Sequence, residues 1–313
     1  NEPAAATDKS RDLVRMAVAK ARHIQPLAEQ TVPVTPRALI LGGGVAGMTA
    51  ALTLADQGYP SVLVEQGAQI GGNLQNLNYT LAGDQVAQHL KGLVDRIKKS
   101  KEIEVITNAE LLQTAGFVGN FSSIIESGKG KTKKEQTVDH GVIVVATGGH
   151  EHRPDKYLLG QSKKVMTQME FEKQLTGRAK NRAPGSIVMI QCAGSRGDDL
   201  SYCSKVCCNH ALKNILKVKA INPDSQIIVL YRDMRAYGMA EDAYLEARKM
   251  GVVFIPYEVD RKPEVSQKSH QVQVSFFDSI MQEEVIMAPD LVVLSVGIVP
   301  DGTEKLSKLL KLP

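Results

Sequence analysis

The stretch ALILGGGVAGMTA, residues 38–50, decides the fold of this chain. A short apolar run is followed by three glycines, and a run of small residues typical of a helix comes next. In this order of strand, turn and helix, Gly42 permits a tight turn, Gly44 lets the backbone approach a pyrophosphate, and Gly47 allows close packing of helix on strand. The stretch therefore predicts a dinucleotide-binding unit. Its expected contact residues are Gly42, Gly44, Val45, Ala46 and Gly47.

The next apolar strand, residues 61–66, carries Glu65 about twenty residues beyond the glycines, where an acidic side chain can hold the ribose hydroxyls of an adenosine. A helix is expected at 84–99 and a further buried strand at 141–149 (GVIVVATGG). Between these two we expect a small antiparallel excursion that includes EVIT at 104–107. The alternation predicts a doubly wound α/β domain.

A second unit of the same kind follows a Lys-, Arg- and Pro-rich linker at 178–184. Its strand is SIVMIQ, its helix lies near 206–220, and QIIVLYRD at 226–233 is the next strand. The apolar run LVVLSVGIVP at 291–300 is expected to return to the first sheet. The chain is thus predicted to hold two nucleotide-type domains.

The first 36 residues are set apart as an arm. An amphipathic helix is expected at about 12–24, followed by an extended piece punctuated by Pro26, Pro33 and Pro36. Its apolar side chains should pack on something, and the chain's own body is favoured over a second subunit because arms usually fold back.

Composition excludes several classes of protein. The 38 basic and 34 acidic residues are spread along the chain, which argues against nucleic acid as a partner. The one dense basic run, KGKTKK at 129–134, is expected to be a solvated hairpin tip. The sequence has no run of about eighteen apolar residues and no apolar core of the signal-peptide type, so we expect a soluble cytoplasmic protein without an integral membrane segment.

All four cysteines fall in one window, QCAGSRGDDLSYCSKVCC, at Cys192, Cys203, Cys207 and Cys208. Thiolates are soft ligands, and four of them between a strand and a helix can hold an iron–sulfur cluster or zinc. The spacing differs from the C-x-x-C pairs of zinc ribbons, which disfavours zinc. Buried inert thiols and a redox-active dithiol of Cys203 with Cys207 remain as alternatives.

Several short segments resemble those of FAD-containing flavoproteins with two dinucleotide-binding domains, of the thioredoxin-reductase type. They are EQG at 65–67, the glycine pair at 71–72, and ATGG at 146–149. This resemblance implies an α/β fold with two doubly wound domains and FAD as the cofactor of the first. The further residues assigned to the FAD site are Gln66, Gly71, Gly72, Asn73, Ala146, Thr147, Gly148 and Gly297.

Three longer stretches resemble the A-type flavin subunit of heterodisulfide reductase over nearly the whole chain. They are the arm and glycine turn (DLVRMAVAKAR, VPVTPRALILGGGVAGMTAALTLADQGY), the cysteine window, and YRDMRAYG with YLEARKMGVVF. In that family the window binds a [4Fe–4S] cluster, which implies Cys192, Cys203, Cys207 and Cys208 as its ligands. The resemblance also implies a lysine, Lys213, near the flavin N5 as a catalytic residue, with a solvated surface lysine as the alternative. It implies partner subunits of the B and C type, and a homodimer as a further arrangement.

The sequence departs from that family in two ways. It lacks the additional cysteines of methanogen-type members, so it resembles the short, single-cluster type found beside sulfur-oxidation or sulfate-reduction genes. Such flavoproteins also close the FAD site with a strand-and-glycine segment after the GIVP stretch. None precedes Pro313, so we expect the end to be missing or FAD to be held less completely.

The second unit lacks a glycine fingerprint, because the turn after its first strand is QCAGSRGDD. Cys192 takes the place of a nicotinamide nucleotide's phosphates, so direct oxidation of NAD(P)H is not expected. The resulting hypothesis is an electron-transfer subunit that moves electrons between FAD and the cluster. The domains would be an arm (1–36), an FAD domain (37–160 with 286–313) and a degenerate NAD-like domain (161–285). The alternatives are an NAD(P)H-dependent disulfide reductase using the dithiol, and a non-catalytic assembly subunit.

Overall fold

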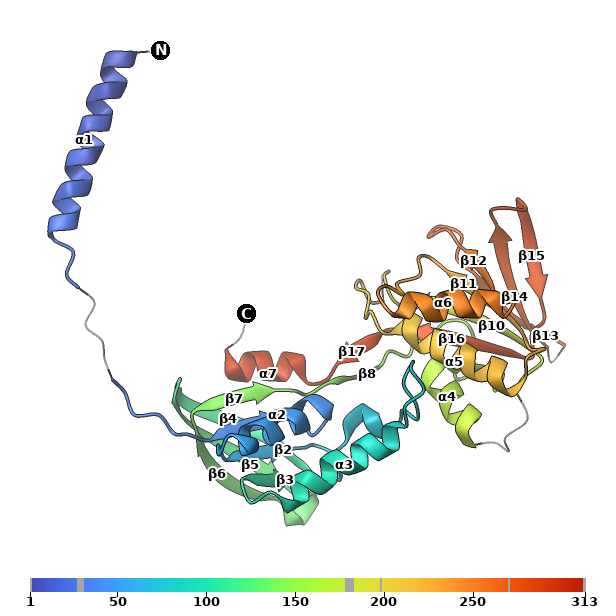
Figure 1. Ribbon diagram of the computed structural model, residues 1–313, viewed down its shortest axis with the longest axis horizontal. Helices are drawn as coiled ribbons and strands as arrows, with labels where there is room; N and C mark the ends of the chain where they lie inside the picture. The colour runs from blue at the N-terminus through green and yellow to red at the C-terminus, as the bar shows by residue number, and fades with distance from the viewer. Residues whose placement is uncertain (1, 27–30, 178–182, 198, 270, 312–313) are drawn as a thin grey trace. The chain divides into compact units, whose positions relative to one another are not determined.

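The computed structural model describes residues 2–26, 31–177, 183–197, 199–269 and 271–311. The chain divides into a unit of residues 1–34 and a unit of residues 35–313, each compact by itself (Figure 1). The first unit contains helix α1 (Pro3–Arg22), which begins earlier than expected. Pro3 suits the first turn, where a missing backbone N–H costs nothing. All side chains of α1 are exposed, and what the arm packs against stays a prediction.

The second unit opens with a parallel sheet in the order β3-β2-β1-β7. The strands are β1 (Ala38–Leu41), β2 (Ser61–Val64), β3 (Ile103–Ile106) and β7 (Val142–Val145). Two helices, α2 (Val45–Asp56) and α3 (Val86–Lys99), cover one face through a shared apolar cluster (Figure 1). The EVIT segment was expected in the antiparallel excursion, and this was wrong. It forms β3, parallel to β2, because α3 carries the chain back across the sheet before it.

The other face of this sheet carries the expected antiparallel excursion. Its strands are β4 (Ala109–Phe117), β5 (Asn120–Ser127) and β6 (Lys134–His140). The basic run lies at the β5–β6 turn, around the short helix η2 (Gly130–Thr132), as the hairpin interpretation predicted. Leu306, Leu309 and Leu310 of α7 (Thr303–Leu310) pack on the apolar cluster of this face. The far C-terminal helix is therefore part of the first domain.

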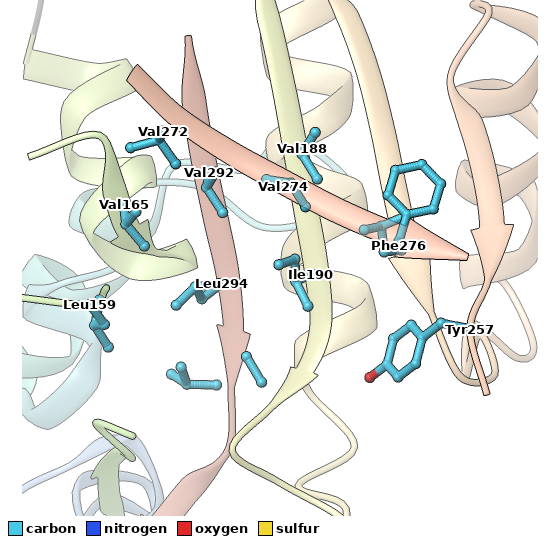
Figure 2. Close-up of a cluster of buried hydrophobic side chains, with 13 residues drawn as sticks. Leu159, Val165, Val188, Ile190, Tyr257, Val272, Val274, Phe276, Val292 and Leu294 are labelled. Carbon is cyan, nitrogen blue, oxygen red and sulfur yellow. The ribbon is translucent and has the colours of Figure 1, made fainter. Parts of the chain in front are cut away.

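Like the first domain, the second has helices on one face of a parallel sheet and an antiparallel sheet on the other. The strand order of its parallel sheet is β12-β11-β10-β16-β9. The strands are β9 (Val165–Thr167), β10 (Ser186–Ala193), β11 (Gln226–Tyr231), β12 (Val253–Pro256) and β16 (Leu291–Val296). Helices α4 (Gln168–Gly177), α5 (Cys207–Ile221) and α6 (Ala240–Lys249) belong to one face. An antiparallel sheet that was not predicted covers the other: β13 (Glu264–Lys268), β14 (Gln271–Asp278) and β15 (Glu283–Met287). Figure 2 shows β14 packing on this face through Val272, Val274 and Phe276.

The sequence predicted that the run LVVLSVGIVP returns to the first sheet, and this prediction was wrong. Its apolar part is β16, which pairs in parallel with β10 and β9 and is buried throughout. A strand that is apolar on both faces belongs in a sheet that is covered on both faces. The second sheet is covered in this way, by helices on one face and by the antiparallel sheet on the other. The chain crosses back only afterwards, where β17 (Ile298–Pro300) pairs antiparallel with β8 (Gly149–Glu151). Residues 178–182 of the predicted linker lie outside the described residues.

None of the helices in the described parts of the chain is both long and apolar enough to cross a membrane.

Candidate functional site

The glycine turn between β1 and α2 has the backbone geometry that its sequence predicts. Gly42 adopts a φ of +108°, and a Cβ built there would lie 2.2 Å from the carbonyl oxygen of Ala146. A Cβ on Gly47 would lie 1.9 Å from the carbonyl oxygen of Gly42. A Cβ on Gly44 would meet no heavy atom of the described chain within 4 Å. Gly42 and Gly47 are thus required by the fold, whereas Gly44 leaves open space at the start of a helix.

That open space belongs to a cavity of about 390 Å³. The predicted cofactor-binding residues that line it are Gly42, Gly44, Val45, Ala46, Glu65, Gln66, Gly72, Asn73, Ala146, Thr147 and Gly148. Three predicted residues fall outside this lining. Gly47 lies behind the turn, and Gly71 approaches Gln75 and Leu90. Gly297 approaches Ser195, Leu200 and Ser204, beside the cysteine window.

Glu65 lies at the end of β2 and is held by the glycine loop. Its Oε2 accepts a hydrogen bond from the Gly43 amide at 2.7 Å, and its Oε1 accepts one from the Gly67 amide at 2.6 Å. The carboxylate therefore borders the cavity at the strand end. An acidic group in this place, next to the start of α2, fits the ribose and pyrophosphate of an adenine dinucleotide.

Part of the cavity wall comes from segments that the sequence did not point to. They are Ala109, Glu110 and Leu111 of β4 and Asp301, Gly302, Lys305 and Leu306 at the start of α7. The Lys305 ammonium and the Glu110 carboxylate are 2.6 Å apart and join the two segments. The Pro-Asp-Gly sequence at 300–302 was the available signal for a turn there, but nothing local indicates that the turn faces the glycines.

The four cysteines surround the junction of β10 and α5. Cys192 lies in β10 with a left-handed φ of +57°, Cys203 lies in the following loop, and Cys207 and Cys208 open α5. All four are free thiols. The other three cysteines lie near enough to Cys207 to raise the pKa of its thiol. Within the described ranges, no three His, Cys, Asp or Glu side chains are grouped as a ready-made metal site.

Three of the four cysteine sulfurs accept hydrogen bonds from N–H groups. The backbone amides of Lys205 and Arg235 lie 3.4 Å from the sulfurs of Cys203 and Cys208, and Arg196 Nη1 lies 3.9 Å from that of Cys192. Donors of this kind stabilise negative charge on sulfur and surround thiolate-bound clusters. In their chemistry, the four sulfur atoms and the N–H groups beside them therefore suit a [4Fe–4S] cluster.

As free thiols, Cys192, Cys207 and Cys208 keep their protons. Burial raises the pKa of Cys192 and Cys208, and burial followed by the neighbouring thiols raises that of Cys207 to about 12. Cys207 accordingly donates its S–H to the carbonyl oxygen of Val296 at 3.1 Å. A bound cation would have to displace these protons to use the sulfurs.

The loop around the cysteines is unusual in backbone and in charge. Besides Cys192, Arg196 and Lys205 adopt left-handed φ values of +59° and +61°. Each such non-glycine conformation costs roughly 1–3 kcal/mol, and such residues cluster at functional sites. Arg196 forms an ion pair with Asp233, and Arg232 donates to the carbonyl oxygen of Arg196 at 2.6 Å. The basic side chains therefore belong to an ordered shell around the window.

Lys213 is buried, with 9% of its side chain exposed, which excludes a solvated surface lysine. Its ammonium lies 2.8 Å from Glu172 Oε2 and 2.8 Å from the carbonyl oxygen of Tyr79. Glu172 also pairs with His210 at 2.7 Å, in line with a structural role for that histidine. Burial raises the pKa of Glu172, but hydrogen bonds from His210 and Lys213 outweigh it and hold the pKa at about 2.

This ion network ties the Tyr79 segment of the first domain to α4 and α5 of the second. The Tyr79 hydroxyl also donates to Asn214 at 2.7 Å. The sequence did not single out Glu172 or Tyr79, since neither belongs to a motif. Lys213 is outside the described lining of the cavity, so its role at a flavin stays a proposal.

A sequence model of the pyridine nucleotide-disulphide oxidoreductase family matches residues 36–194. The chain belongs to this family of oxidoreductases. Among solved structures it is similar to the thioredoxin reductases of Lactococcus lactis and T. acidophilum, with TM-scores of 0.57 and 0.55 at 18% and 15% identity. These matches cover 87% and 85% of this chain and 80% and 79% of theirs. They confirm the predicted α/β fold of the thioredoxin-reductase type.

Curated relatives match over the full chain at 29% identity. They include the A-type subunit of the H(2):CoB-CoM heterodisulfide,ferredoxin reductase of Methanothermobacter thermautotrophicus and an A-type iron-sulfur subunit of the CoB–CoM heterodisulfide reductase of Methanopyrus kandleri. The chain spans 61% of the length of each. The resemblance to the A-type subunit of heterodisulfide reductase, stated from the sequence, is confirmed.

Proposed function

We propose that the chain is an electron-transfer flavoprotein component of a heterodisulfide-reductase-like complex. It would move electrons between FAD in the glycine-loop cavity and a [4Fe–4S] cluster on the four cysteines, in sulfur metabolism and in the cytoplasm. The four cysteines of the given sequence lie in one window, so the proposal assigns one cluster to these residues.

One observation carries this proposal. The four thiols and their N–H donors lie around the junction of β10 and α5, where a nucleotide-type domain would otherwise hold phosphates. The first domain keeps a cavity with a glycine turn and a strand-end carboxylate. One domain is thus suited to a dinucleotide and the other to a sulfur-ligated group.

Each part of the chain has a stated role in this proposal. The amides at the start of α2 would take the pyrophosphate, and Glu65 would exchange its bonds to Gly43 and Gly67 for ribose hydroxyls. Cys192, Cys203, Cys207 and Cys208 would hold the cluster, with the backbone amides of Lys205 and Arg235 donating to sulfur. When bound, FAD supplies two-electron and the cluster one-electron chemistry. Lys213 would be the lysine near the flavin N5, with Glu172 as its counter-ion.

The partners proposed are subunits of the B and C type, and a homodimer is a further arrangement. The surface beside the cysteines supports a protein partner, because apolar side chains are exposed there. Val206 precedes Cys207, and Tyr237 and Met239, 68% and 91% exposed, follow the Arg235 amide that reaches Cys208. Large exposed apolar groups next to a redox site favour contact with another protein.

Anaerobic purification tests the proposal. We expect about four iron and four acid-labile sulfide per chain, together with flavin released on denaturation. Colourless protein with neither component would contradict it. Iron without sulfide would indicate a mononuclear site in place of the cluster.

The family name and the thioredoxin reductase fold favour one rival, an NAD(P)H-dependent disulfide reductase with a Cys203/Cys207 dithiol. Stopped-flow mixing of oxidised protein with NADH or NADPH separates the two. The cluster hypothesis expects slow or absent flavin bleaching, because the second domain lacks a glycine fingerprint. Rapid bleaching at low coenzyme concentration would support the dithiol enzyme.

A further inference from the structure

Gln191, the residue before Cys192, has a buried side chain with no partner. It is 0% exposed, and in the described part of the chain neither its amide oxygen nor its amide nitrogen forms a hydrogen bond. Its backbone is fixed, since the Tyr257 hydroxyl donates to its carbonyl oxygen at 2.7 Å. Leaving a buried polar group unpaired costs about 1–3 kcal/mol. The fold tolerates this cost beside the four thiols.

The strand geometry directs this amide to the side of the sheet that α5 covers. Val188 and Ile190 point into the apolar cluster drawn in Figure 2, on the face covered by β14. Side chains alternate along a strand, so Gln191 faces the opposite side, with Met189. Met189 belongs to the apolar cluster that contains Leu212 and Ile215 of α5.

The first turn of that helix carries Cys207 and Cys208. The Cys207 sulfur reaches across to Val296, which ends the neighbouring strand β16. Cys192 follows Gln191 directly, at the irregularity of β10 where the pairing with β16 shifts register. The unpaired amide is therefore enclosed at the end of β10, one residue before the first cysteine of the window.

A second glutamine on this side of the sheet shows that the fold can satisfy an amide here. Gln168, 2% exposed, donates through Nε2 to Ser295 Oγ at 3.1 Å, and its Oε1 accepts from Asn214 at 2.8 Å. The two residues share chemistry and burial, but only Gln191 has spare donors. An acceptor outside the polypeptide would account for the difference.

We propose that the Gln191 amide donates a hydrogen bond to a sulfur of the cluster held by the four cysteines, and thereby raises its reduction potential. This inference rests on the proposed function. A donor aimed at sulfur stabilises the reduced form more than the oxidised form, because reduction adds negative charge to the cluster. Gln191 acts as a tuning residue and not as a ligand.

The test compares Gln191→Met with Gln168→Met in the full chain, since methionine has similar length and no N–H. The cluster's reduction potential is measured anaerobically by EPR-monitored titration, and the melting temperature is measured on the iron-free protein. For Gln191→Met we expect unchanged iron and flavin and about a tenfold shift of the redox equilibrium toward the oxidised form, which is ~59 mV for one electron. Its iron-free form should melt no lower than the wild type, because an unpaired amide is removed.

Gln168→Met should show the opposite pattern, with a lower melting temperature and an unchanged potential. A wild-type chain without iron and sulfide would overturn the proposed function and this inference together. A loaded Gln191→Met variant with the wild-type potential would overturn this inference alone and assign the amide to a buried water. If Gln191→Met fails to load, Gln191→Leu gives the second measurement, since it also removes the N–H without adding a donor and must lower the potential as well.

Discussion

The two nucleotide-type domains differ at the junction between a central strand and the helix that follows it. In the first, residues 42–44 alone separate β1 from α2, and the helix starts at the cavity. In the second, residues 194–206 separate β10 from α5, and β10 carries a register shift before it ends. The short turn leaves backbone amides and open space at the start of α2. The long turn carries basic residues and Cys203, and its backbone is left-handed at Arg196 and Lys205, as it is at Cys192 just before the turn.

Under the proposed function, the fold sets where a ligand binds, whereas the turn sets which ligand. A turn without side chains leaves room for a phosphate at a helix N-terminus. A longer turn can bring soft ligands and N–H donors to the same place, but it requires residues in strained conformations. The following predictions test this division between the two sites.

The largest effect is expected for Gly44→Val, which should abolish flavin binding. A valine there projects into the cavity, because a Cβ at Gly44 has no described neighbour within 4 Å. The fold should survive with a loss of at most about 1 kcal/mol, since valine is a poor N-cap residue. Absorbance and denaturant titration measure the two effects. Gly92→Ala, in an exposed helix position, is the control and should retain flavin. Full complex activity in Gly44→Val would instead support a non-catalytic assembly role.

At the other junction, Cys208→Ser should remove the iron and sulfide while FAD remains. Serine oxygen is a harder ligand than thiolate and suits the cluster poorly. Metal analysis and flavin quantification on the same sample give both values. Ser201→Ala, an exposed neighbour in the same loop, should keep both components. Retention of four iron by Cys208→Ser would show that this cysteine is not a ligand.

A smaller effect is expected where the two domains meet. Glu172→Gln should lower the free energy of unfolding by about 3–5 kcal/mol, because it leaves buried Lys213 without its counter-ion. Chemical denaturation measures the loss. The matched control is Glu304→Gln, which breaks an exposed pair with Lys308 and should change stability by less than about 0.5 kcal/mol. A Glu172→Gln variant as stable as the control would mean that the network does not join the domains.

The smallest expected effect is a change in the stability of the fold at low pH. The pKa of Glu172 is about 2 in the folded chain against an ordinary value of 4.5, so this carboxylate stabilises the fold fully above pH 4.5. The contribution is lost as the pH falls from 4.5 toward 2. The stability difference between wild type and Glu172→Gln should therefore shrink as the pH is lowered through that range. A difference that stays constant on acidification would contradict the depressed pKa.

Local sequence was sufficient wherever a short segment determines its own structure. The glycine turn, the hairpin tip at 129–134 and the helix that starts at Cys207 could all be predicted, because spacing and periodicity within about a dozen residues decide them. The same patterns indicated most of the cavity lining.

Features that depend on distant segments were missed or misplaced. The run at 291–296 is apolar on both faces, so it suits the middle of either sheet, and only pairing with β10 and β9 decides. Glu172 has no motif, and its role comes from Lys213 and His210 on another helix. The wall formed by Asp301, Gly302 and Lys305 faces glycines more than 250 positions earlier in the chain.

That wall has a consequence for biosynthesis. The ribosome makes the glycine turn before the second domain, but the residues at the start of α7 emerge only after that domain. A nascent chain therefore presents a half-built pocket open to water along one side. Under the proposed function, a flavin would meet its complete pocket only after the second domain has been synthesised.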